Sequence, residues 1–118
     1  MEKIVEQGIL YDFYGELLTG HQRQIYEAAV YNDLSLREIA EENGISRQGV
    51  HDLLKRCDKI LAGYEKKLHL VEKFNRVKKK VEAIEKLSET ADGEMRADDS
   101  AQALRQAGRL AHEILEEL

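Results

Sequence analysis

The stretch Ser35–Arg56, SLREIAEENGISRQGVHDLLKR, decides the fold of this chain. Ser35 and Glu38 have the spacing of a capping box, which predicts that a helix begins directly after Ser35. Gly44 ends that helix, because glycine readily adopts the left-handed conformation that closes a helix C-terminus. Ser46 can cap a second helix two residues later. The stretch therefore predicts two helices joined by a tight turn.

Apolar residues follow a helical repeat on both sides of this turn. The positions predicted to be buried are Leu36, Ile39, Ala40, Ile45, Val50, Leu53 and Leu54. The small side chain of Ala40 lets the two helices approach closely. Asn43 occupies a position that is more often apolar, and we expect it to cap the first helix instead. This layout is a helix-turn-helix, whose second helix can enter the major groove of DNA. The alternative is an ordinary helical hairpin with no nucleic-acid partner.

Composition indicates an all-α protein. The 118 residues suffice for one domain, or for one domain with a helical extension. Proline is absent and glycine is sparse, which favours long helices. No apolar run approaches the ~20 residues that span a bilayer, and the start has no signal-peptide pattern. The single cysteine excludes an internal disulfide. We expect a soluble cytoplasmic protein.

Charge is distributed in three blocks. The net charge of −5 hides a basic segment, residues 46–80, with eleven Lys/Arg and four Asp/Glu. Residues 1–45 hold three Lys/Arg and nine Asp/Glu, and residues 81–118 hold four and ten. A basic block that begins at the proposed recognition helix fits a surface facing phosphates. The alternative is the solvated face of a long helix.

Two further helices precede the central stretch. Apolar residues within 3–18 cover a broad helical face, and Thr19 with Gln22 forms a second capping box that opens a helix through about Tyr31. We expect these helices to cover the back of the helix-turn-helix in a small four-helix bundle. We assign residues 1–60 to a DNA-binding domain.

Residues 61–118 are predicted to form an oligomerisation region. No helix breaker follows Ser46 until residues 91–93, so the recognition helix either runs on or kinks near Gly63. An apolar stripe from Ile60 to Leu87 needs a partner helix. After a loop at 91–99, a last helix from about Ser100 either folds back as a hairpin or pairs between subunits. Both arrangements predict a homodimer.

The solvent side of the second helix carries the candidate DNA-binding residues. They are Ser46, Arg47, Gln48, His51, Lys55, Arg56 and Lys59. Arg and Gln have the geometry to recognise guanine and adenine edges, and the lysines suit phosphates. Asp52, on the same side, is expected to orient Arg47 or to accept a hydrogen bond from cytosine.

The sequence predicts no active site, no metal site and no cofactor. The four histidines have no metal-ligand spacing with one another or with Cys57. Cys57 falls on the buried side of its helix, which predicts a packed thiol. Phosphate-binding glycine loops are absent.

Two resemblances sharpen these expectations. Leu18–Gln24, Asp33–Glu41 and Gly44–Arg47 resemble region 4 of bacterial sigma factors, which binds the promoter −35 element. Residues 1–75 resemble more closely the YlxM family of small bacterial proteins, through Tyr11–Thr19, Tyr31–Leu36 and Glu42–Val50. The resemblance implies a sigma region 4-like helix-turn-helix bundle with a long C-terminal helical extension.

The YlxM resemblance also implies a function. Members are described as helix-turn-helix DNA-binding proteins, and their genes commonly lie beside the gene for the signal recognition particle GTPase. This implies a DNA-binding regulator linked to protein targeting. The alternative is a regulator that contacts the signal recognition particle GTPase or its RNA without binding DNA.

Overall fold

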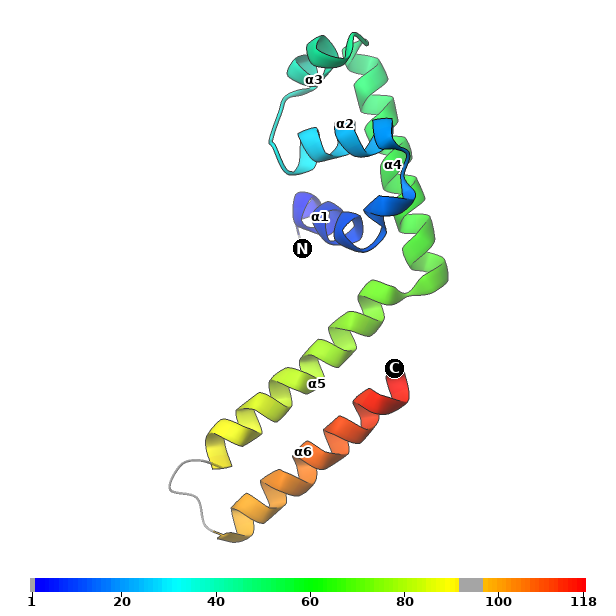
Figure 1. Ribbon diagram of the computed structural model, residues 1–118. Helices are drawn as coiled ribbons and strands as arrows, with labels where there is room; N and C mark the ends of the chain where they lie inside the picture. Colours follow the sequence, from blue (N-terminus) through cyan, green and yellow to red (C-terminus); the bar gives the residue numbers. More distant parts are fainter. Residues whose placement is uncertain (1, 92–96) are drawn as a thin grey trace. The chain divides into compact units, whose positions relative to one another are not determined.

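The computed structural model describes residues 2–91 and 97–118, and these form helices with no strand among them (Figure 1). The elements are α1 (Lys3–Tyr14), the 3-10 helix η1 (Gly15–Leu17), α2 (Gly20–Val30), α3 (Leu36–Asn43), α4 (Arg47–Leu68), α5 (Leu70–Ala91) and α6 (Ala97–Glu117). The prediction of an all-α chain is confirmed. None of the described helices is apolar over a length that would cross a lipid bilayer.

The chain divides into two compact units. The first, Met1–Val71, contains α1 to α4, and the second, Glu72–Leu118, contains most of α5 and all of α6. The first unit extends beyond residue 60 because α4 continues without a break to Leu68. The assignment of residues 1–60 to DNA binding and of 61–118 to oligomerisation stays a prediction.

Helix boundaries in the first unit follow local capping signals. Both predicted capping boxes are formed, by Thr19 with Gln22 at α2 and by Ser35 with Glu38 at α3. Each serine or threonine hydroxyl accepts a backbone N–H that the first helical turn would otherwise leave without a partner. The helix predicted within residues 3–18 ends earlier, because α1 gives way to η1 at Gly15.

The core of the first unit consists of two buried clusters around α4. One contains Tyr14, Leu18, Tyr26, Cys57 and Leu61, and the other contains Ile25, Ala28, Ile39, Ala40 and Val50. Half-buried Leu53 and Leu54 pack against both clusters. Helices α1, α2 and α3 all pack on α4, as Figure 1 shows. The expected four-helix bundle is therefore formed, with α4 as its central element.

Tyrosine hydroxyls satisfy carboxylates at the edge of this core. Tyr26 donates to Asp58 at 2.6 Å, and Gln7 donates to the same carboxylate at 2.9 Å. Burial, and then the hydrogen bond to Asp58, raise the pKa of Tyr26 far above its ordinary value. Tyr31 donates to Asp12. These bonds connect α1, α2 and α4, so they fix how the three helices pack.

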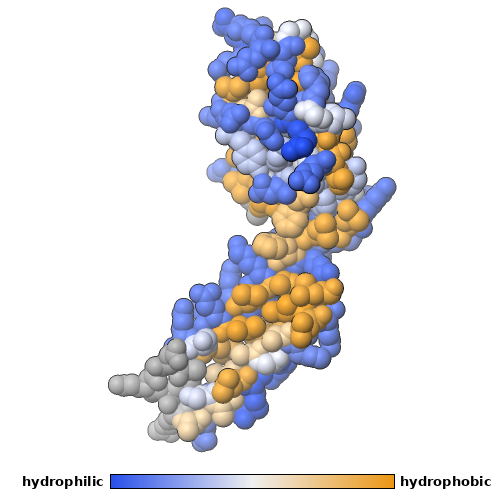
Figure 2. Space-filling model, in the orientation of Figure 1, coloured by the Kyte–Doolittle hydropathy of each residue, from blue (hydrophilic) through white to orange (hydrophobic). Residues whose placement is uncertain are grey.

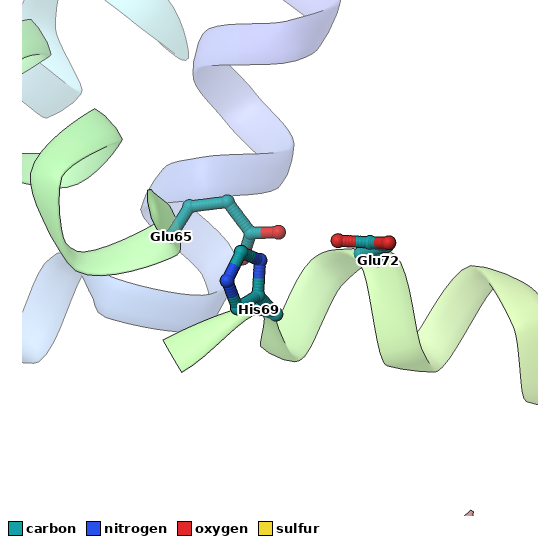
Figure 3. Close-up of side chains that lie close together, drawn as sticks. All are labelled: Glu65, His69 and Glu72. Carbon is teal, nitrogen blue, oxygen red and sulfur yellow. The ribbon is translucent and has the colours of Figure 1, made fainter. Parts of the chain in front are cut away.

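Helix α4 ends at Leu68, where neither of the sequence alternatives placed a break. Gly63 lies within the helix, so the helix runs on and does not kink there. His69 adopts a left-handed conformation with φ 55°, and Figure 3 shows it beside Glu65 in the last turn. The Glu65 carboxylate accepts hydrogen bonds from the Tyr14 hydroxyl at 2.5 Å and from the Val71 N–H at 3.0 Å. A residue of α1 thus helps to stop α4.

The second unit is an antiparallel hairpin of α5 and α6. Arg76 donates to Glu117 at 2.8 Å, and Lys80 lies 3.6 Å from Glu113, so the start of α5 is beside the end of α6. Of the two arrangements left open by the sequence, the structure has the hairpin. Helix α6 begins at Ala97, three residues before the expected Ser100, and most of the expected loop lies outside the described residues.

Candidate nucleic-acid interface

The turn between α3 and α4 has the geometry that the sequence predicts. Gly44 is left-handed with φ 65°, and its N–H closes α3 on the Ala40 carbonyl. The Asn43 side chain donates to the Ile39 carbonyl at 2.8 Å, so it caps the end of α3 as expected. The Ile45 N–H also donates to Ala40 at 3.1 Å. All these bonds hold α4 at one angle to α3.

Packing behind the turn agrees with the sequence prediction except at one position. Ile39, Ala40 and Val50 are buried, and Ile45 is half-buried. The prediction that Leu36 is buried was wrong, because 39% of this residue is exposed. Leu36 is the first residue of α3, and the buried residues of this short helix, Ile39 and Ala40, lie further along it.

Ser46 begins the proposed recognition helix. Its hydroxyl accepts a hydrogen bond from the Gly49 N–H at 2.9 Å. The side chain is therefore used to cap the helix and not to bind a ligand. A Cβ at position 49 would meet this hydroxyl at 3.1 Å, which is a tight contact. The serine therefore positions the first turn of α4, and Arg47 projects from that turn.

All seven candidate residues are exposed on α4 or at its start. At 100° per residue, Val50, Cys57 and Leu61 face the core. The opposite face carries Gln48, Lys55 and Lys59. The remaining candidates, Arg47, His51 and Arg56, flank this face. Ser46 directly precedes the helix. We call these seven exposed residues, which extend along the chain from Ser46 to Lys59, the α4 face.

A hydrogen bond within the α4 face changes the expected role of Asp52. The Gln48 amide donates to the Asp52 carboxylate at 2.9 Å. Asp52 was expected to orient Arg47 or to accept a hydrogen bond from cytosine, but in the structure it accepts one from Gln48. Asp52 therefore orients the amide of Gln48, leaving its carbonyl oxygen as an acceptor.

Two hollows beside the α4 face contain cations that the sequence analysis missed. Arg37 of α3 lines one hollow together with Arg47, and forms an ion pair with Glu41 at 3.2 Å. Lys3 of α1 lines the other hollow with Lys55, Arg56 and Lys59. Two acidic residues, Asp52 and Asp58, line it as well. Arg37 could have been found from its place on the first helix of the motif. Lys3 is far from α4 in sequence, and no local signal indicates it.

Cys57 is a packed core residue, as predicted. It is buried in the cluster that contains Leu61. Burial, and then the charge of Asp58, raise the pKa of its thiol to about 11. A neutral, enclosed thiol is a poor nucleophile and a poor metal ligand.

Comparison with known proteins gives the family. Residues 1–102 match the family model UPF0122, described as "Putative helix-turn-helix protein, YlxM / p13 like". A UPF0122 protein of Acetivibrio thermocellus is 40% identical over 116 residues, which cover 98% of this chain and 99% of that protein.

Two other relatives match over a shorter length. A UPF0122 protein of Caldanaerobacter subterraneus is 55% identical over 76 residues, 64% of this chain and 65% of the relative. One from Clostridium botulinum is 52% identical over 79 residues, 67% of this chain and 72% of the relative. The chain therefore belongs to the UPF0122 family of YlxM-like helix-turn-helix proteins.

Proposed function

We propose that this protein is a DNA-binding regulator that inserts the first turns of α4 into the major groove. The observation that carries the proposal is the α4 face: seven exposed polar side chains, from Ser46 to Lys59, on a helix that a glycine turn holds against α3. In helix-turn-helix proteins the N-terminal residues of the second helix contact base edges. Arg47 and Gln48 occupy that place here.

Direct recognition of bases is assigned to three side chains. Arg47 can donate two hydrogen bonds to guanine, and its exposed position leaves its guanidinium accessible. Gln48 recognises adenine once its amide leaves Asp52, so Asp52 holds the side chain ready in the free protein. His51 lies one turn further along α4 and reaches the next base pairs.

Phosphate contacts are assigned to the cations around these residues. Lys55, Arg56 and Lys59 line one hollow with Lys3, and Arg37 lines the other. Helix α4 as a whole carries six Lys/Arg and three Asp/Glu, whereas the chain has a net charge of −5. The cations therefore favour this surface for DNA, and the acidic remainder of the chain lowers non-specific affinity.

The link to protein targeting is a finer proposal that rests on the YlxM resemblance alone. A second candidate function is that of a regulator of the signal recognition particle, bound to its GTPase or its RNA. Exposed Lys78 and Lys79 on α5 support it, because they offer phosphate contacts outside the α4 face. Both candidates place the protein in the cytoplasm.

The test is selection of bound sequences from a pool of random duplex DNA, at low and physiological salt. We compare the unchanged chain with Arg47→Ala and Lys67→Ala. Lys67 is a matched control, because it is an exposed cation on the same helix, about 30 Å further along the axis. We expect an enriched motif that survives physiological salt. Arg47→Ala should weaken binding to it by about 1–3 kcal/mol, and Lys67→Ala should not.

Other outcomes separate the two candidates. Binding that disappears with salt and enriches no sequence would contradict the DNA-reading proposal, because it would be only electrostatic. Binding to the signal recognition particle GTPase or its RNA that survives Arg47→Ala would then support the second candidate.

A further inference from the structure

The hairpin of the second unit lacks a core of its own. Among its described side chains only Ala103 is buried, whereas residues such as Leu87, Leu110 and Ile114 are half-buried. Two helices of about twenty residues each bury too little apolar surface to offset the entropy of ordering them. Helical proteins meet this need by packing a second pair of helices on the first.

One side of the hairpin carries the missing contact surface. Val77, Val81 and Ile84 recur along one face of α5, with Val81 49% exposed. The matching residues are Leu104 and Leu115 on α6 and Leu118 directly after it, exposed by 72%, 70% and 79%. Figure 2 shows hydrophobic side chains forming a band along the hairpin. We call these six residues the hairpin face.

Charges along the edge of the hairpin face identify its occupant. The outer edge of α5 carries exposed Lys78 near the start and exposed Glu82, Glu85 and Glu89 toward the end. A second α5 that runs antiparallel presents the same residues in reverse order. With Val81 near the two-fold axis, Lys78 of each copy then lies close to Glu85 of the other. A parallel copy would place like charges together.

We propose that the hairpin face binds the hairpin face of a second copy of this chain, with the two α5 helices antiparallel, to form a four-helix bundle. The self-complementary order of charges on α5 favours a second copy over an unrelated partner. The bundle buries Val81 and Leu104, which the single hairpin leaves in water. It deepens the proposed function, because each dimer then carries two α4 faces for two half-sites on DNA.

The test is sedimentation equilibrium of the full chain from about 1 to about 100 µM. We expect a dimer, and we expect Val81→Lys to raise its dissociation constant about tenfold or more. Lys79→Ala is the control, because Lys79 is exposed on α5 but, at 100° per residue, lies about 160° around the helix from Val81, on the side away from the hairpin face. A monomer at all concentrations would overturn the proposal.

A charge swap tests the antiparallel arrangement. Lys78→Glu or Glu85→Lys alone should raise the dissociation constant about threefold to tenfold, and the two together should restore it. Circular dichroism checks that each variant keeps its helices. A dimer that the double variant does not restore would contradict antiparallel pairing. Neither result depends on DNA, so failure here is distinguishable from failure of the proposed function.

Discussion

The two units of this chain bury their apolar residues in different ways. The first unit surrounds α4 with three helices and fully encloses large side chains such as Tyr14, Tyr26 and Leu61. In its described residues the second unit has two helices and buries the side chain of only one residue, Ala103. The difference teaches that a closed core allows α4 to expose a wholly polar face, whereas an open hairpin exposes an apolar one. We therefore expect the same kind of change to act differently in the two units.

The largest expected difference concerns core leucines. Leu61→Ala should lower the free energy of unfolding of the first unit by about 2–5 kcal/mol, because it leaves a cavity among buried aromatic residues. Leu110→Ala in the half-buried hairpin should cost less than half as much. Urea titrations measure the two losses in free energy of unfolding, with tyrosine fluorescence and far-ultraviolet circular dichroism as the signals. Equal losses would contradict the distinction between closed and open packing.

Replacing glycine by alanine should change the stability in opposite directions in the two units. Gly44→Ala should destabilise the first unit by about 1–2 kcal/mol, because its φ of 65° is strained for any residue with a Cβ. Gly108→Ala should stabilise α6 by up to about 1 kcal/mol, since a Cβ there meets no atom within 4 Å. Thermal melts of both variants measure whether each substitution raises or lowers the melting temperature. A stabilising Gly44→Ala would refute the turn geometry.

Alkali should weaken the first unit through its tyrosines. All five tyrosines lie in it, and burial followed by the hydrogen bond to Asp12 raises the pKa of Tyr31 to about 12. The folded state therefore favours the neutral phenol. Its contribution to stability is present below the unfolded pKa of about 10, and is lost as pH rises toward 12.

Unfolding titrations between pH 9 and pH 12 measure this loss. Tyr31→Phe should flatten the decline, and Phe13→Leu, which removes no phenol, should not. A stability that does not change over this range would contradict the tyrosine–carboxylate contacts.

Acid should lower the stability of the second unit. This is the smallest of the effects that we predict. The hydrogen bond from Arg76, assisted by Lys80, lowers the pKa of Glu117 below its ordinary value. The carboxylate therefore contributes stability above its unfolded pKa, and the contribution is lost as pH falls through the lowered folded pKa. Glu117→Gln should remove this acid dependence. Glu116→Gln is the matched control, since Glu116 lies on the exposed side of α6 with His112.

Local signals explain how much the sequence could predict. The capping serines, Gly44 and the capping side chain of Asn43 act within a few residues of themselves, so pattern alone predicted them. The break at His69 depends on Tyr14, more than fifty residues away, whose hydroxyl accepts the Leu70 N–H and donates to Glu65. No glycine or proline marks that position. Lys3 likewise joins the cations of α4 only through the packing of α1.

The central claim is that the α4 face, and not the hairpin, contacts DNA. The most direct measurement is photo-crosslinking of the full chain to duplex DNA from a photoreactive residue at His51 or at His112. Both histidines are exposed on helices, one on the α4 face and one on α6. We expect crosslinks to bases from position 51 and none from position 112. DNA binding with crosslinks from position 112 and none from position 51 would contradict the account.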